Sequence, residues 1–298
     1  MYNITAVIVT NNRLDLLKEA VAAVKAQTYQ PKQIIVVNNE STDGTAEWLD
    51  NQTGVHVIHQ KNLGGSGGFF TGIKSAVSMN ADWIWVMDDD TICQKDTLQI
   101  LVQKLELLNK PVGFIGSKCI WKDGSPHLMN LPAIMPSFNK KISFNKYDDK
   151  RLLLIETNSF VSILINSKAV KKVGLPYKEF FIWGDDQEYT RRITKAGYLG
   201  FYCMDSIVLH KTGVNYFPDF YRDNVPNLWK HNYGFRNEFF MVKKNKGFIF
   251  FIFWLVIKVI YTSIKLLIIR KDDQLKFLRV LFNSAAKSIF FNPKISYV

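Results

Sequence analysis

The sequence predicts an α/β fold in which helices cover both faces of a mostly parallel β-sheet. Short apolar runs alternate with amphipathic helical stretches through the first 120 residues. The runs are almost continuously apolar, which is typical of strands buried on both faces. Polar clusters follow four of them, and in such sheets ligands bind at the carboxyl ends of the strands. With 298 residues, of which 47% are hydrophobic, the chain can form one large domain or two modest ones.

The four N-terminal strands are predicted at 5–10, 33–39, 55–60 and 82–89. Apolar residues recur at helical spacing through 14–27, and the stretch "STDGTAEWLD" has turn residues that lead into a short helix. The polar clusters "TNN", "NNESTD", "NLGG" and "DDD" follow the four strands. We therefore expect these clusters to meet along one edge of the sheet.

The second half of the chain is less regular. Residues 121–150 are polar and contain proline, so we expect a long surface loop there. Two strands are predicted near 152–165, followed by a helix around 166–173. A helix is predicted from Asp186 to Ala196, because acids occupy its start, bases its end, and Gly197 follows it. The stretch "YLGFYCMDSIVLH" is expected to form a strand pair that ends at His210.

The net charge of +12 is concentrated in the C-terminal tail. From Lys243 onward there are eleven lysines and arginines and two acids, a balance of +9, which leaves +3 for the first 242 residues. The tail also contains an apolar run of over twenty residues, interrupted only by Lys258 and Lys265. Because the basic residues accompany an apolar helix, their charge favours a membrane surface as the partner and argues against nucleic acid.

Three interpretations of this apolar run are open. Its length permits a membrane span, since about 20 apolar residues cross a bilayer. The two lysines are seven residues apart and share one helical face, as in a monotopic helix that lies in the membrane interface. A helix buried in the protein core is the third possibility. We prefer the interfacial anchor, which divides the chain into an α/β domain, 1–240, and a basic, apolar membrane-association region, 241–298.

The location expected for the α/β domain is the cytosol. The chain enters a strand-like run almost at once, without the pattern of a secretory signal. Cys93, Cys119 and Cys203 lie far apart and form no CxxC pair, which favours a reducing compartment over a disulfide framework or a zinc module. Together with the basic tail, this predicts a protein at the cytoplasmic face of the cell membrane.

A glycine-rich segment precedes the fourth strand and contains Gly64, Gly65, Gly67 and Gly68. It is no Walker A loop, because Ile73 stands where that loop needs lysine, and Phe70 breaks the GxGxxG pattern. Four glycines still allow close approach of backbone amides to an anionic ligand. A flexible turn that begins a helix is the alternative.

Three acids, Asp88, Asp89 and Asp90, follow the fourth strand directly. Alternate residues of an extended segment point the same way, so Asp88 and Asp90 can face one ligand while Asp89 faces the other side. Two carboxylates on one side suit Mg²⁺ or Mn²⁺, which bind oxygen ligands and are commonly shared with substrate phosphates. An acidic turn is the alternative, but three crowded carboxylates without a cation would have raised pKa values.

A third cluster, "WGDDQE", places an aromatic residue and acids at a helix N-terminus. One of its carboxylates can act as a general base toward a hydroxyl, although helix capping by Asp185 or Asp186 is an equal alternative. His210 ends a strand further along, and a lone histidine is more often structural than a ligand. The other four histidines, His56, His59, His127 and His231, have no comparable neighbours in the sequence.

Taken in order, "VIVTNNR", "VVNNESTDGT", "NLGGSGGF", "MDDDT", "WGDDQE" and a following histidine resemble the family 2 glycosyltransferases with the GT-A fold, a Rossmann-like sheet flanked by helices. The resemblance covers most of residues 4–240 and is strongest to bacterial galactofuranosyltransferases, with rhamnosyltransferases next. In this family, the DxD carboxylates and a later histidine hold Mn²⁺ or Mg²⁺ against the donor diphosphate. The resemblance therefore implies Asp88, Asp90 and His210 as the metal ligands.

The same resemblance implies the remaining site residues. Asp186 corresponds to the catalytic base, and Trp183 to a wall of the sugar pocket. The residues implied at the sugar or acceptor are Gly64, Gly65, Gly67, Gly68, Asp185 and Glu188, and those implied at the nucleotide are Thr10, Asn38, Asn62 and Asp89. Many members have aspartate where this chain has Asn38, which puts base contact through that residue in doubt. "YGFRN" at 233–237 is similar to a family signature, with no role evident from the residues.

The implied activity is an inverting, metal-dependent transfer of galactofuranose from UDP-galactofuranose to a cell-surface or lipid-linked polysaccharide. A rhamnosyltransferase that uses dTDP-rhamnose and a non-catalytic nucleotide-sugar-binding protein are the alternatives. A nucleotidyltransferase is disfavoured, because Arg13 is the one basic residue in "TNNR" that could meet a triphosphate.

Overall fold

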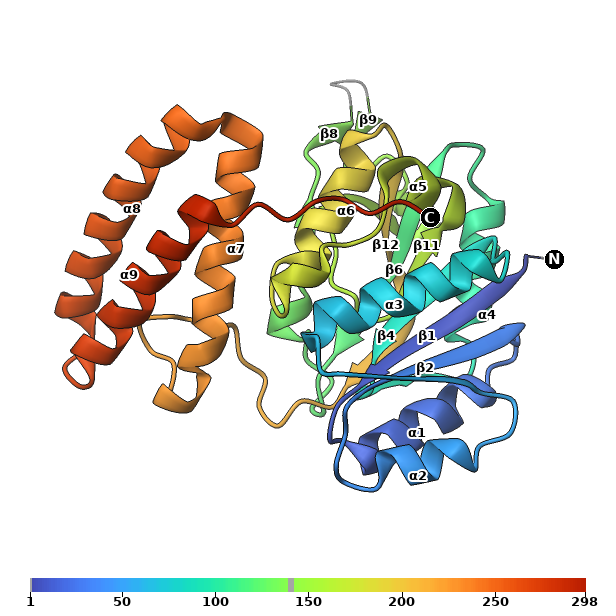
Figure 1. Ribbon diagram of the computed structural model, residues 1–298. Coiled ribbons are helices and arrows are strands. Elements are labelled where there is room, and N and C mark those ends of the chain that lie inside the picture. The colour runs from blue at the N-terminus through green and yellow to red at the C-terminus, as the bar shows by residue number, and fades with distance from the viewer. Residues whose placement is uncertain (1, 139–141) are drawn as a thin grey trace.

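The computed structural model describes residues 2–138 and 142–298, which form a large sheet with helices on both faces and a group of helices beside it (Figure 1). The strands of this sheet are β1 (Ile4–Thr10), β2 (Gln33–Asn39), β3 (His56–Gln60), β4 (Trp83–Asp88), β5 (Thr91–Cys93), β6 (Val112–Ile120), β7 (Ala133–Ile134), β10 (Leu152–Thr157), β11 (Ile163–Asn166) and β12 (Leu199–His210). Their order is β3-β2-β1-β4-β11-β6-β12-β10-β7, and β5 pairs with β12. The short strands β8 (Ser137–Phe138) and β9 (Ile142–Ser143) pair with each other.

The predicted α/β fold and its four N-terminal strands are confirmed. β1, β2, β3 and β4 are parallel neighbours, so their carboxyl ends lie on one edge. Beyond β4 the sheet becomes mixed, because β11 runs antiparallel to both β4 and β6. The strand direction therefore reverses between β4 and β11, and the acids that follow β4 lie next to this reversal.

Helices cover the sheet and complete the C-terminal part. They are α1 (Leu14–Lys25), α2 (Thr45–Asp50), α3 (Gly64–Ser78), α4 (Thr97–Glu106), α5 (Ser167–Val173), α6 (Asp185–Lys195), α7 (Leu228–Lys246), α8 (Phe248–Ile269) and α9 (Gln274–Phe290). Short 3₁₀ turns lie at Leu128–Asn130, Asp148–Lys150, Lys178–Phe180 and Val225–Asn227. The predicted helices at 166–173 and 186–196 correspond to α5 and α6 within one residue.

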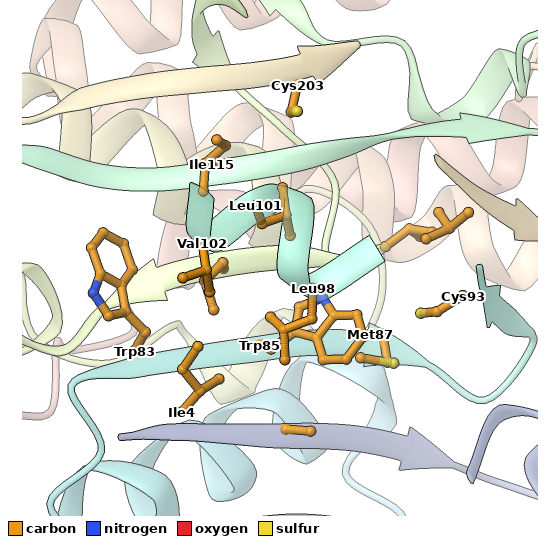
Figure 2. Close-up of a cluster of buried hydrophobic side chains, with 14 of the residues drawn as sticks. Ile4, Trp83, Trp85, Met87, Cys93, Leu98, Leu101, Val102, Ile115 and Cys203 are labelled. Atoms are coloured by element: carbon orange, nitrogen blue, oxygen red, sulfur yellow. The ribbon is translucent and has the colours of Figure 1, made fainter. Parts of the chain in front are cut away.

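The strands divide the core into two layers, because successive side chains point to opposite faces. On β1, Ile4, Ala6 and Ile8 join the layer under α1, α2 and α4, whereas Val7 and Val9 join the layer under α3, α5 and α6. Figure 2 shows the first layer, where Trp85 and Met87 of β4 pack against Leu98 and neighbouring side chains of α4. The two buried layers hold β4 rigidly and so fix the start of the acidic segment that follows it.

The C-terminal helices form a separate group beside the sheet (Figure 1). α7 packs against both α8 and α9, around a core that includes Phe239, Phe251 and Phe277. The last residues return to the α/β part, where the Leu175 amide donates to the Ser296 carbonyl at 2.8 Å. α7 runs without a break through the predicted domain boundary between 240 and 241.

Three details of the sequence prediction need correction. The stretch predicted as a strand pair is the single strand β12, with an irregularity between Cys203 and Ile207. β6 was not predicted, although it is buried at the centre of the sheet. The expected loop at 121–150 contains short strands and 3₁₀ turns, and Asn130 within it is buried. Residues 139–141 of that stretch lie outside the described residues.

Candidate active site

A cavity of about 860 Å³ opens at the edge where the strands end. It is lined by seven residues singled out in the sequence: Gly65, Asp88, Asp90, Trp183, Asp185, Asp186 and His210. They come from four separate parts of the chain, namely α3, the end of β4, α6 with its preceding loop, and the end of β12. The fold therefore brings the "DDD" cluster, the "WGDD" cluster and the histidine to one cavity.

Asp88, Asp90 and His210 form a cluster that can hold a metal ion, because one ligand atom from each lies within 4.8 Å of the others. Strand pairing explains the proximity. β5 turns back from the acids and pairs with β12, which places His210 opposite Thr91, the residue after Asp90. The Nε2 atom of His210 consequently lies 3.0 Å from Asp90 Oδ1.

The hydrogen bonds of His210 indicate which nitrogen faces the acids. The amide nitrogen of Asn130 donates to the Ser159 hydroxyl at 2.9 Å, so its oxygen faces Nδ1 of His210, at 2.7 Å. Nδ1 must therefore carry hydrogen, and Nε2 faces the Asp90 carboxylate. Two electron-rich atoms at 3.0 Å require a proton or a cation between them. A carboxylate, carboxylate and imidazole donor set suits Mn²⁺ or Mg²⁺, so these residues fit the predicted metal.

Asp89 points away from this cluster. It is buried, and its Oδ2 accepts a hydrogen bond from the Thr10 hydroxyl at 2.8 Å. Arg13 joins the two sides, since its Nη1 lies 3.2 Å from Asp89 Oδ1 and 2.8 Å from Asp90 Oδ2. The three acids thus have different environments, in line with the predicted alternation along an extended segment.

The pKa values of the three acids shift in different directions: those of Asp88 and Asp89 are raised, and that of Asp90 is lowered. Burial, reinforced by Asp90, raises the pKa of Asp88 to about 7. Burial also raises the pKa of Asp89 to about 6, against the opposing charge of Arg13. For Asp90, burial is outweighed by His210 and Arg13, which lower its pKa. A cation added here would favour the ionised form of Asp88.

Asp186, the residue predicted as the base, lines the cavity. It lies in the first turn of α6, and Oδ1 accepts a hydrogen bond from the Gln187 amide at 2.7 Å. Burial raises its pKa to about 8, and the carboxylates of Asp185 and Asp88 add to this shift. Burial raises the pKa of Asp185 to about 6. A carboxyl group whose pKa is raised toward neutrality thus lies in the same cavity as the acidic cluster, and such a pKa suits a group that exchanges protons near neutral pH.

Several residues predicted at the ligand do not line the cavity. Glu188 is buried between Arg192 and Lys244, at 2.8 and 3.0 Å. Asn38 contacts His59, and the Asn62 side chain accepts a hydrogen bond from the Gly64 amide. Their predicted contacts with sugar or nucleotide remain predictions.

The glycine segment begins α3, and its glycines serve mainly to bring chain segments together. A Cβ at Gly68 would lie 2.3 Å from Val9 Cγ1, and one at Gly67 would lie 2.3 Å from Leu63 Cβ. Gly64 has φ +71°, where an added Cβ would meet the Phe181 carbonyl oxygen. Among the four glycines, Gly65 lines the cavity.

Three residues at or near the cavity have partners far along the chain, so the sequence did not single them out as site residues. His127 is buried, and its ring centroid lies 4.4 Å from that of His210. His231 lines the cavity and packs edge-on against Trp183 at 5.0 Å. Asn130 belongs to a stretch expected to be loop. Since each lies more than 45 positions along the chain from its partner, no local pattern could identify it.

The fold and the cavity define the class of protein. A mostly parallel sheet flanked by helices, with an acidic cluster that could hold a metal ion at the carboxyl ends of its strands, is the arrangement of a GT-A glycosyltransferase. The solved structure of Staphylococcus aureus TarS supports the fold, with a TM-score of 0.53 at 16% identity over 80% of this chain and 43% of that chain. This chain thus spans less than half of the TarS chain.

Sequence comparisons identify the family. Residues 5–174 match the profile described as "Glycosyl transferase family 2", so the chain belongs to glycosyl transferase family 2 and is a glycosyltransferase. It is 27% identical to the galactofuranosyltransferase GlfT1 of Mycolicibacterium smegmatis, over 72% of each chain. It is 26% identical to the Mycobacterium tuberculosis GlfT1, over 83% of this chain and 82% of the other. A Staphylococcus aureus poly-beta-1,6-N-acetyl-D-glucosamine synthase is 29% identical over 35% of this chain and 25% of its own length.

Proposed function

We propose that this chain transfers galactofuranose from UDP-galactofuranose to a cell-surface or lipid-linked polysaccharide, with inversion at the sugar carbon. The observation that carries the proposal is the presence of Asp186 and the Asp88, Asp90 and His210 cluster in one cavity of about 860 Å³. A cavity of this size accommodates a nucleotide sugar together with the end of an acceptor. Similarity to the GlfT1 proteins over most of the chain supports the choice of sugar.

In the proposed reaction, Asp186 removes the proton from an acceptor hydroxyl. The oxygen attacks C1 of the sugar from the side opposite the nucleotide, and the bond between C1 and the diphosphate oxygen breaks. The nucleoside diphosphate leaves with the bonding electrons, and the proton remains on Asp186. A bound Mn²⁺ or Mg²⁺ supplies charge stabilisation of the departing diphosphate. Asp88, Asp90 and His210 would hold this ion.

The charge near Asp186 supports a link between metal binding and ionisation of the base. With a pKa of about 8, Asp186 is largely protonated at neutral pH. The Asp88 carboxylate contributes to this pKa, so neutralising Asp88 favours the ionised base. Trp183 lines the same cavity and provides an apolar wall for a sugar ring.

We also propose that α8 binds the membrane surface by its outward face, with the protein on the cytoplasmic side. α8 is long and apolar enough to cross a membrane by length and composition. Its residues Phe251, Leu255, Val259, Thr262 and Leu266 are buried against the protein, whereas Ile249, Phe253, Val256, Ile257, Ile260, Ile264 and Ile268 are exposed. The two lysines share a face as predicted, but it is the inward one. Lys258 pairs with Glu238 at 3.1 Å, and Lys265 lies over the Tyr221 ring.

Packing favours an interfacial helix over a span. α7 packs along α8 and lines the cavity with residues such as His231 and Glu238. A spanning α8 would draw the charged helix α7 into hydrocarbon, where ionised side chains are costly. The outer face of α8 is apolar and suits the boundary between headgroups and acyl chains. The basic residues of region 241–298 suit the anionic surface of a bilayer. On this view, region 241–298 associates with the membrane and region 1–240 carries the chemistry, joined through α7.

A nucleotide panel tests the donor. The melting temperature of the protein would be measured with UDP, dTDP, UDP-galactofuranose and dTDP-rhamnose, each with and without Mn²⁺. Stabilisation by UDP that depends on Mn²⁺, with transfer from UDP-galactofuranose, would support the proposal. Stabilisation by dTDP alone would point to the rhamnosyl alternative. Donor binding without hydrolysis or transfer would indicate a non-catalytic nucleotide-sugar-binding protein.

A further inference from the structure

The loop that precedes α6 has an unusual backbone. Phe181 has φ +67°, Trp183 has φ +64°, and Gly184 has φ +87°. Positive φ is unfavourable for bulky residues, and such conformations persist only where surrounding contacts hold them. Two of these residues are aromatic, and the loop leads directly to Asp185 and Asp186.

Asn237 of α7 supplies contacts that hold this loop. Its side chain is fully buried, and its amide nitrogen donates to the carbonyl oxygens of Phe180, Ile182 and Trp183 at 3.0, 3.2 and 2.8 Å. One side chain therefore contacts three backbone carbonyls of this loop.

Arg236 adds a second set of contacts from the same helix. Its Nη2 donates to the carbonyls of Glu179 and Phe180, at 2.7 and 3.1 Å. It also donates to Asn237 Oδ1 at 2.9 Å, which orients the Asn237 amide toward the loop. The guanidinium lies 3.9 Å from the Phe291 ring centroid, so a cation–π interaction also holds the arginine in place.

The opposite side of the loop rests on the start of α3. The Ser66 amide donates to the Phe181 carbonyl at 3.2 Å. A Cβ at Gly64 would lie 2.1 Å from the same oxygen, so the close approach needs glycine there. The glycine segment and the "RN" pair of "YGFRN" thus hold one loop from two sides.

We propose that Arg236 and Asn237 are positioning residues, which keep residues 180–183 in the shape that places Trp183 and the base Asp186 in the cavity. This role rests on the proposed function for the identity of the base, and it assigns a role to the "RN" pair. The C-terminal helices then contribute to the active site as well as to membrane binding, because α7 carries both residues.

The test compares Asn237→Asp, Asn237→Ala and Arg236→Met with the control Asn245→Ala. Asn245 lies on α7, is exposed, and forms its hydrogen bonds with Lys195 and Met241. Asn237→Asp keeps the shape of the side chain but places carboxylate oxygens against three carbonyls, so it should impair transfer more than Asn237→Ala. We expect kcat to fall by roughly 10²-fold, as a displacement of about 1 Å can cause. Mn²⁺-UDP affinity should stay within about threefold, because the metal ligands lie on other elements.

A spectroscopic readout separates positioning from general stability. In protein labelled with 5-fluorotryptophan, the ¹⁹F resonance of Trp183, assigned through Trp183→Phe, should shift or broaden in both Asn237 variants and stay unchanged in Asn245→Ala. Wild-type kcat in Asn237→Asp would overturn the proposal, as would equal losses of kcat and donor affinity. If the Asn237 variants do not fold, Arg236→Met gives the same comparison with a milder change. A Trp183 resonance and a kcat that are both unchanged in Arg236→Met would also overturn the proposal.

The ¹⁹F measurement needs no substrate. If the wild-type protein transfers no sugar, the proposed function fails, yet a shifted Trp183 resonance still supports the positioning role. If transfer is normal and the resonance is insensitive to both positions, the positioning role fails while the proposed function stands.

Discussion

The Asn130 side-chain oxygen lies 2.7 Å from His210 Nδ1, on the ring nitrogen opposite the acids. Asn130 is held in turn by the Ser159 hydroxyl at 2.9 Å. A residue from an irregular segment therefore sets which nitrogen of His210 faces Asp90. Partners of this kind, which orient a metal-binding histidine, are commonly worth 10–100-fold in affinity.

Asn130→Ala should weaken Mn²⁺ binding by roughly 10–100-fold, because the His210 ring loses the contact that fixes its orientation. Isothermal titration of Mn²⁺ in the presence of UDP measures this effect. Asn145→Ala, an exposed asparagine in the same segment, is the control and should bind Mn²⁺ normally. Equal affinities in the two variants would contradict the role given to Asn130.

Mn²⁺ affinity should rise with pH. Burial lowers the pKa of His210, but the charge of Asp90 outweighs this effect and raises the pKa above its ordinary value. Asp88, with a pKa of about 7, also holds a proton near neutrality. Both protons compete with the ion, so affinity should increase between about pH 6 and pH 8, by at most about tenfold per pH unit for each proton released. His210→Gln should bind more weakly and show a shallower pH dependence, and a flat profile in the wild-type protein would count against His210 as a ligand.

Asp186→Asn should abolish transfer while it stabilises the protein. The folded pKa of about 8 lies above the ordinary value of 3.8, so ionisation of this carboxyl costs folding free energy. That cost is absent below about pH 4, grows as pH rises, and is complete above about pH 8. The melting temperature of Asp186→Asn should therefore exceed that of the wild-type protein by more at pH 8 than at pH 4. A difference that shrinks with rising pH, or full activity in the folded variant, would refute the assignment.

The outward face of α8 should control membrane binding. Phe253 and Ile260 are 69% and 54% exposed, and Phe253→Glu or Ile260→Glu places a charge on that face. Sedimentation with vesicles that contain anionic lipid should show binding reduced by roughly tenfold or more, from lost apolar burial and added repulsion. Leu107→Glu changes an exposed leucine at the end of α4 and serves as the control. Normal vesicle binding by both α8 variants would leave the membrane proposal without support.

The fold could be predicted largely from local patterns. β1, β2 and β4 are buried on both faces, so they appear in the sequence as continuous apolar runs. β12 was harder to predict, because its pairing is irregular between Cys203 and Ile207, and its sequence therefore resembles two short strands. β6 contains two glycines in nine residues, which weakened its apolar pattern. Its place in the sheet depends on neighbours far along the chain.

By itself, the sequence determined the kinds of residue at the site. The family resemblance rests on the order of the glycines, the paired acids, "WGDD" and a histidine. Each of these motifs lies at a strand end or a helix start, where a few consecutive residues suffice to form it. The environments that tune these groups were decided only by the tertiary structure. Asn130 faces His210 across 80 positions, and Asn237 holds a loop more than 50 positions away. Such distant segments form hydrogen bonds and bury one another only when the chain packs, so no local pattern of residues can predict these contacts.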